Sequence, residues 1–221
     1  MIEYDISTTI VNADASKEVN GLGGGSVPKA NQIANDLERM EYPTTFTISE
    51  CPAGNRFMNQ LMAVTGQRYN MVMNDIGTGT GRDYMLLGYR ADCFTENRRY
   101  DDVATLRTAK CIPIRLHNLA TNEDLLYVSL HHSRSNRQQR EEQRALAAFV
   151  EREESSPDGF DMVIIGGDTN APPNVIRRWQ PANTSILIEE RKSPVRFISN
   201  ITIAVELAVF LSINRIDEIY E

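Results

Sequence analysis

The chain has 221 residues and a net charge of −7, with 41% hydrophobic and 24% charged residues. This composition is ordinary for a globular protein, and the length suits one large domain, so we expect residues 1–221 to form a single domain. No run of about eighteen apolar residues is present, so no transmembrane helix is predicted. The acidic balance argues against a general polyanion-binding protein, because a nucleic-acid or phosphoinositide substrate would need a locally basic face or metal ions.

The amino-terminal sequence MIEYDISTTI carries early acidic residues and no basic segment, so it does not resemble a secretory signal. The three cysteines are odd in number and lack CxxC spacing, which argues against a disulfide framework and against a cysteine-based metal site. They are Cys51, Cys93 and Cys111. We therefore expect free thiols and a protein that is cytoplasmic or is delivered from a bacterial cytoplasm.

In the first half of the chain, alternating apolar residues predict a strand over 2–12. Helical spacing then predicts a helix between Pro28 and Pro43. A β-branched strand follows and ends at Glu50. A short helix is predicted over 55–64, with inward positions at Phe57, Leu61 and Val64.

Two strands follow at 68–74 and 82–90, and a strand pair at 111–119 and 124–130 is joined by a polar turn. A long helix is predicted over 136–153, with an apolar stripe formed by Leu146, Phe149 and Val150.

A buried strand is predicted over 160–167, and the last apolar strands between 197 and 220. Neighbouring strand pairs argue against one all-parallel sheet. They predict an α/β fold of the α+β type, in which two packed mixed sheets flanked by helices form a four-layer sandwich.

Polar residues stand at the ends of four predicted strands. In chain order they are Asn12, Glu50, His131, and the pair Asp168 and Asn170. Because strand ends on one edge of a sheet converge, we expect these side chains to share one site.

Asp168 and Asn170 are two positions apart, so in an extended segment both would point into the same space. There they could hold Mg²⁺ or a water molecule and contact a phosphate oxygen. The alternative is an Asx turn that ends the strand. The same alternation would turn His132 away from His131.

These residues resemble the endonuclease/exonuclease/phosphatase superfamily, which includes deoxyribonucleases, cytolethal distending toxin nucleases and sphingomyelinases. The resemblance is carried by IVNAD at Asn12, ISECP at Glu50, SLHHS at His131, GGDTN at Asp168 and Asn170, and RIDEIY over 215–220. Ser49 stands where the family commonly has Gln.

The resemblance implies a Mg²⁺- or Mn²⁺-dependent phosphoesterase, with a phosphodiesterase or nuclease preferred. Its substrate would be a nucleic acid or a phosphorylated small molecule or lipid. Glu50 would be the metal ligand, and the catalytic group would comprise His131, Asp168, Asn170 and Asn12.

Two arginines are candidate substrate-binding residues. Arg82 precedes a strand at a place that resembles a deoxyribonuclease arginine in contact with the phosphate backbone. Arg134 could form a basic rim beside His131 together with Arg137, Arg140 and Arg144. The interspersed Glu141 and Glu142 favour a solvated helix face over a nucleic-acid groove.

The family pattern ends with a Ser-Asp-His motif, and the 221 residues contain no such motif. Either the sequence stops before the family's last strand, or part of the site has been lost. In both cases we expect weak metal binding through Glu50 and poor or absent cleavage, because a positioned acid or base contributes about 10²–10⁴-fold. The alternatives are a catalytically impaired relative that binds a phosphorylated ligand or a protein partner, and a phosphoinositide or sugar phosphatase.

Overall fold

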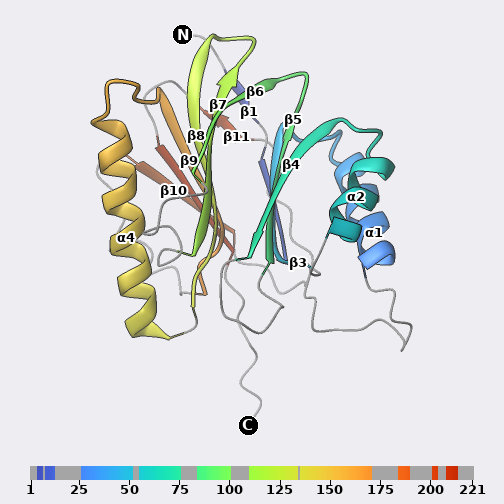
Figure 1. Cartoon of the computed structure of the whole chain (residues 1–221), viewed down its shortest axis with the longest axis horizontal. Helices are drawn as coiled ribbons and strands as arrows, with labels where there is room; N and C mark the ends of the chain where they lie inside the picture. Colours follow the sequence, from blue (N-terminus) through green and yellow to red (C-terminus); the bar gives the residue numbers. More distant parts are fainter. Residues whose placement is uncertain are drawn as a thin grey trace.

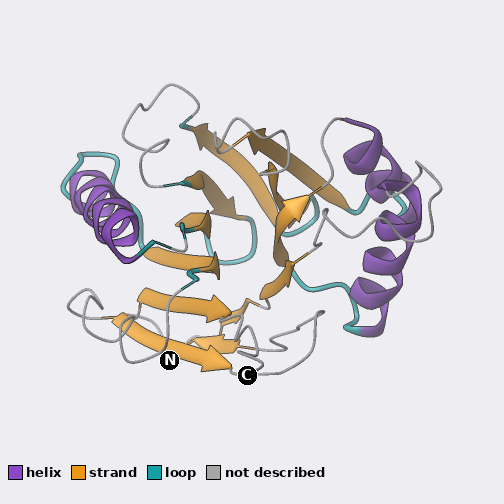
Figure 2. Ribbon diagram, turned by 90° about the horizontal axis from the view of Figure 1, so that it is seen from below, coloured by secondary structure: helices purple, strands orange, loops and turns teal. Residues whose placement is uncertain are grey.

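The computed structural model describes residues 4–6, 8–12, 26–51, 55–75, 84–100, 110–133, 135–170, 184–189, 201–203 and 208–213. Over these residues the fold has four layers. Two sheets pack face to face, helices α1 and α2 cover one outer face, and helix α4 covers the other (Figures 1 and 2). The predicted sandwich of two mixed sheets between helices is confirmed. No helix in this part of the chain has the length and apolar character needed to cross a membrane.

The smaller sheet has the strand order β2-β3-β5-β4. Its strands are β2 (Thr8–Asn12), β3 (Thr45–Cys51), β5 (Tyr84–Arg90) and β4 (Tyr69–Asp75). β2 and β3 are parallel and the other pairs are antiparallel. A separate strand, β1 (Tyr4–Ile6), pairs with β11 (Ile201–Ile203), so the single strand predicted over 2–12 is wrong. The segment instead divides between two sheets.

The larger sheet has the order β10-β12-β9-β8-β7-β6. Its strands are β10 (Thr184–Glu189), β12 (Ala208–Ile213), β9 (Met162–Asp168), β8 (Glu123–His131), β7 (Cys111–Asn118) and β6 (Phe94–Arg99). The β8–β9 pair is parallel, whereas β7 pairs antiparallel with both of its neighbours.

Sequence reasoning missed β6 and β10. β6 is an edge strand whose exposed polar residues lack the apolar alternation of a half-buried strand.

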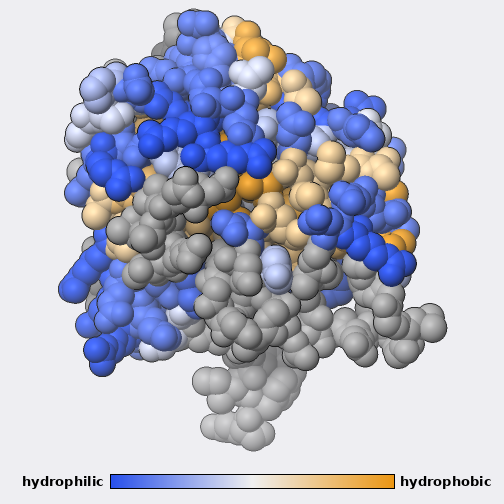
Figure 3. Space-filling view, viewed as in Figure 1, coloured by the Kyte–Doolittle hydropathy of each residue, from blue (hydrophilic) through white to orange (hydrophobic). Residues whose placement is uncertain are grey.

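The helices in the described part of the chain are α1 (Ser26–Arg39), α2 (Asn55–Val64) and α4 (Asn136–Glu154). The bounds of α2 agree with the prediction, and Phe57 and Leu61 are buried as expected. Val64 was expected to point inward and is instead 41% exposed. It is the last residue of α2, so no further turn carries it over the sheet. Hydrophobic residues gather on the α2 side of the face in Figure 3, where this helix and β4 lie.

Among the described residues, three apolar cores separate the four layers. One lies between the sheets, one between the larger sheet and α4, and one between the smaller sheet and α1 and α2. β8 and β9 alternate between two of them. Tyr127 and Ile164 lie in the inter-sheet core, whereas Val128 and Ile165 pack in the α4 core. This alternation decides which face each polar residue at the strand ends occupies.

Candidate functional site

Glu50 is presented toward the larger sheet by an irregularity at the end of β3. Phe46 and Ile48 face the α1–α2 core, and the next β3 residue in that core is Cys51, three positions on instead of two. The β3–β5 register shifts between Ile48 and Cys51, and Glu50 has a φ of 53°. Such a bulge re-aims a side chain at a strand end. The Glu50 carboxylate therefore approaches the opposite sheet, where its Oε1 lies 3.8 Å from Nε2 of His131.

Buried hydroxyl groups connect the two sheets along the faces that lead to this contact. Thr8 Oγ1 lies 2.8 Å from the hydroxyl of Tyr127, and Thr47 Oγ1 lies 2.5 Å from Oγ of Ser129. Ser129 and His131 are two positions apart on β8, so His131 continues the same inter-sheet face. These hydrogen bonds fix the alignment of β3 against β8 and hence of Glu50 against His131.

Asp168 ends the strand next to that of His131. β8 and β9 are parallel, and their register pairs His131 with Asp168. Asp168 continues the face of Ile164, which belongs to the inter-sheet core. Asp168 is 3% exposed, whereas the side chains of His131 and Glu50 are 11% and 19% exposed. Of the three residues, Glu50 and His131 are therefore the more accessible to solvent.

Asn170 contacts Asp168, but not by the extended geometry that we expected. Asn170 has a φ of 47°, and its backbone N–H donates to Oδ1 of Asp168 at 2.9 Å. The expected extended arrangement is wrong, and the alternative, an Asx turn, is present. It forms because the strand ends at Asp168 and the backbone turns at once. The Asn170 amide instead donates from Nδ2 to the carbonyl of His132 at 2.7 Å.

The other predicted site residues lie partly or wholly outside the described residues. For Asn12 only the backbone is described, and it pairs in register with Ser49, next to Glu50. Arg82, Arg134 and the segment 215–220 lie outside it altogether. The roles predicted for these residues stay predictions.

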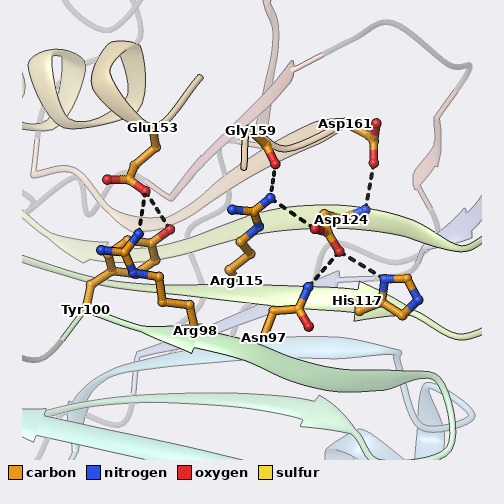
Figure 4. A network of polar contacts seen from close by, with 9 residues as sticks. All are labelled: Asn97, Arg98, Tyr100, Arg115, His117, Asp124, Glu153, Gly159 and Asp161. Atoms are coloured by element: carbon orange, nitrogen blue, oxygen red, sulfur yellow. Dashed lines mark hydrogen bonds and ion pairs between the residues drawn. The ribbon is translucent and has the colours of Figure 1, made fainter. Parts of the chain in front are cut away.

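The two other histidines do not contribute a side chain to this face. His132 is buried on the α4 side, and burial, followed by the nearby His131 and Lys110, lowers its pKa to about 3. His117 Nδ1 lies 2.9 Å from Asp124 Oδ1, in a polar network with Asn97 and Arg115 (Figure 4). That network is at the opposite end of β8, roughly 20–25 Å from His131 along the strand.

Helix α4 also buries polar side chains that sequence reasoning missed, and the solvated position expected for Glu142 is wrong. Gln139, Glu142 and Gln143 are buried on the face that carries Leu146 and Phe149. Both oxygens of Glu142 accept hydrogen bonds from Ser133, and Gln139 donates to the carbonyl of Asn170 at 2.6 Å. Helical spacing with the apolar stripe was the sequence signal that could have found them, because residues three and four apart share a face.

Comparisons with known proteins were informative only at the level of structure. No protein-family model and no curated protein matches the chain. Humanised TDP2 of D. rerio matches with a TM-score of 0.59 and 16% identity over 81% of this chain and 69% of its own. An endonuclease/exonuclease/phosphatase family protein of Bacteroides thetaiotaomicron matches with a TM-score of 0.57 and 15% identity over 77% and 65%. ANGEL2, a 2′,3′-cyclic phosphatase, matches with a TM-score of 0.58 and 14% identity over 77% and 55%.

The chain therefore has the fold of the endonuclease/exonuclease/phosphatase superfamily, and the resemblance found in its motifs is confirmed at the level of the fold. The matches span 69%, 65% and 55% of the lengths of the three related chains, so this chain spans about two thirds of their length or less. What it does with the fold depends on the site itself.

Proposed function

We propose that the chain is a metal-dependent phosphoesterase that hydrolyses a phosphodiester at the strand ends carrying Glu50, His131 and Asp168. The observation that carries the proposal is the 3.8 Å approach of the Glu50 carboxylate to the His131 imidazole from the opposite sheet. Two carboxylates and an imidazole on one face can hold a metal ion, orient a water molecule and stabilise a charged phosphoryl group.

At this site, Glu50 is the one side chain that we propose as a ligand of a divalent ion. Among the described residues, no three His, Cys, Asp or Glu side chains are grouped as a metal cluster. Mg²⁺ does not need such a cage, because it keeps several water ligands and is commonly held by one or two carboxylates. Glu50, with its carboxylate partly exposed, would hold the ion. When bound, Mg²⁺ or Mn²⁺ supplies Lewis-acid polarisation of a phosphoryl oxygen.

The remaining groups have separate roles in the proposal. Asp168 would orient the attacking water and accept its proton. His131, in its protonated form, would donate a hydrogen bond to the negative charge that develops on phosphorus-bound oxygen. Asn170 would hold Asp168 in place through the hydrogen bond from its backbone N–H. Asn12, Arg82 and Arg134 are proposed to contact phosphate oxygens.

The activities and ligands named for structurally similar proteins support a phosphoester substrate. ANGEL2 is a 2′,3′-cyclic phosphatase, a Bacteroides thetaiotaomicron protein is a mannosyl-6-phosphatase, and TDP2 of D. rerio has been solved with a single-strand DNA product. These substrates share a phosphoester bond and differ in everything else. We therefore propose a phosphoester substrate and prefer a phosphodiester.

A paired assay tests the proposal. Residues 1–221 are supplied with bis(p-nitrophenyl) phosphate, p-nitrophenyl phosphate and supercoiled plasmid, each with Mg²⁺, with Mn²⁺ and with EDTA. We expect metal-dependent release of p-nitrophenol from the diester, with Glu50→Gln behaving like the EDTA sample. Hydrolysis that is equal with EDTA and with metal, or that Glu50→Gln leaves unchanged, would refute metal dependence through Glu50. No hydrolysis of any substrate would refute the proposed activity.

A further inference from the structure

Helix α4 buries a charged side chain where an apolar one would complete its packing. Glu142 is 4% exposed and lies on the same helix face as Leu146 and Phe149, which pack against the larger sheet. A buried carboxylate is unfavourable unless it is fully hydrogen-bonded, and well-packed apolar residues often replace such groups without loss of stability. The contacts of Glu142 therefore require an explanation other than packing.

Those contacts reach the segment that follows His131. Glu142 Oε2 accepts the backbone N–H of Ser133 at 2.8 Å, and Oε1 accepts the Ser133 hydroxyl at 2.5 Å. Oε1 also lies 3.9 Å from Nζ of Lys110. The carbonyl of Lys110 in turn accepts the backbone N–H of His131 at 3.1 Å. Glu142 thus contacts the segment that follows His131 directly. It also contacts Lys110, the residue whose carbonyl accepts the His131 backbone N–H.

A second side chain of α4 holds the segment that follows Asp168. Gln139 lies one helical turn before Glu142, and its Nε2 donates to the carbonyl of Asn170 at 2.6 Å. The Asn170 side chain donates to the carbonyl of His132, and the backbone N–H of His132 donates to the carbonyl of Asp168 at 2.9 Å. The two strand ends are therefore bonded to each other and, through Gln139 and Glu142, to one face of α4.

We propose that Glu142 is a positioning residue that sets the orientation of His131 through Ser133 and Lys110, with Gln139 doing the same for the Asp168 strand end. The inference rests on the proposed phosphoesterase function. Glu142 does not contact the substrate in this scheme. Its loss would displace His131 relative to Glu50 and Asp168, and a displacement of about 1 Å can lower a rate by about 10²-fold.

The chain offers a matched control on the same helix. Glu153 is 5% exposed, and its Oε2 accepts the Tyr100 hydroxyl at 2.8 Å, at the end of α4 away from the strand ends (Figure 4). Glu142→Gln and Glu153→Gln therefore remove the same charge from equally buried positions. Of these two variants, only Glu142→Gln weakens a contact to the segment after His131. Ser133→Ala removes the hydroxyl half of that contact and leaves the Ser133 backbone N–H bonded to Glu142.

The experiment measures kcat and KM for bis(p-nitrophenyl) phosphate, together with the NMR shift of the His131 Hε1 proton. We expect Glu142→Gln to lower kcat about 10²-fold with KM nearly unchanged, Ser133→Ala to lower it less, and Glu153→Gln to leave it near wild type. The His131 signal should move in Glu142→Gln and Ser133→Ala and stay fixed in Glu153→Gln.

Equal effects of Glu142→Gln and Glu153→Gln on kcat would overturn the positioning role, as would an unmoved His131 signal in Glu142→Gln and Ser133→Ala. If Glu142→Gln fails to fold, Ser133→Ala decides by the same two measurements. If the wild-type chain hydrolyses nothing, the proposed function fails, whereas the NMR comparison still decides whether Glu142 sets the environment of His131.

Discussion

Nε2 of His131 lies 3.8 Å from Oε1 of Glu50, although the two residues belong to different sheets. The approach depends on a bulge in one strand and on the alignment of two sheets, neither of which is local to His131. It places a carboxylate able to hold a cation beside an imidazole able to bond an anion. The proposed function rests on this contact.

Glu50 is expected to dominate the affinity for a divalent ion. Glu50→Gln should weaken binding of Mn²⁺ by at least about tenfold, because even groups that only orient a metal ligand commonly change affinity 10–100-fold. Titration calorimetry measures this without any substrate. Glu38→Gln, an exposed change on α1, is the control and should bind Mn²⁺ as the wild type does. Equal affinity of Glu50→Gln and wild type would remove Glu50 from the metal site.

Gly167 allows β9 to pass β8 at the strand ends. It has a φ of 145°, and a Cβ there would overlap the backbone of Leu130. Gly167→Ala should lower the free energy of unfolding by about 2–4 kcal/mol through strain and overpacking combined. Gly66 also has a positive φ, of 64°, but its Cβ would meet nothing within 4 Å. Gly66→Ala should therefore cost only about 1 kcal/mol in urea unfolding. Similar losses for both variants would contradict the close approach.

The hydrogen bond between Thr47 and Ser129 is expected to hold the two sheets in alignment. Thr47→Val should lower the free energy of unfolding by about 1–3 kcal/mol, because it deprives a buried Ser129 hydroxyl of this partner. The double variant with Ser129→Ala should lose less than the sum of the single losses. Thr95→Val, at an exposed position of β6, is the control. Strict additivity of the two losses would mean that the pair does not interact.

Acid should destabilise the fold through His132. Its pKa is lowered to about 3 in the folded chain, against about 6.5 for an unperturbed histidine. Between these values the unfolded chain binds a proton that the folded chain does not, so stability falls as the pH falls from about 6.5. The contribution approaches about 1.4 kcal/mol per pH unit. Urea unfolding of wild type and His132→Gln across this range should give converging curves as the pH drops. Parallel curves would contradict a neutral buried His132.

Much of the architecture was predictable from local patterns. Helical periodicity gave the bounds of α2, a β-branched run located β3, and an apolar strand pair around a polar turn located β7 and β8. β6 was not predictable, because its polar residues become a strand only by pairing with the edge of β7. Tertiary pairing overrides weak local preference in such edge strands.

The strand-end placement of these residues was predictable, whereas the geometry between them was not. Strand-end placement was enough to group Glu50, His131 and Asp168. No Gly or Pro lies within the bulge at 48–51, although Pro52 follows it directly, so the sequence did not reveal the turn of Glu50 toward His131. The extended geometry expected for Asn170 failed because a short-range hydrogen bond to Asp168 competed with strand continuation.

The most direct test of the proposed site compares the two ends of β9. Asp168 ends the strand beside His131, whereas Asp161 precedes its first residue and accepts the Asp124 backbone N–H at 2.8 Å. The measurement is kcat/KM for bis(p-nitrophenyl) phosphate with Mn²⁺, for wild type, Asp168→Asn and Asp161→Asn. We predict a loss of at least about 10²-fold for Asp168→Asn and a rate close to wild type for Asp161→Asn. Metal-dependent hydrolysis that Asp168→Asn leaves intact would contradict the proposed site.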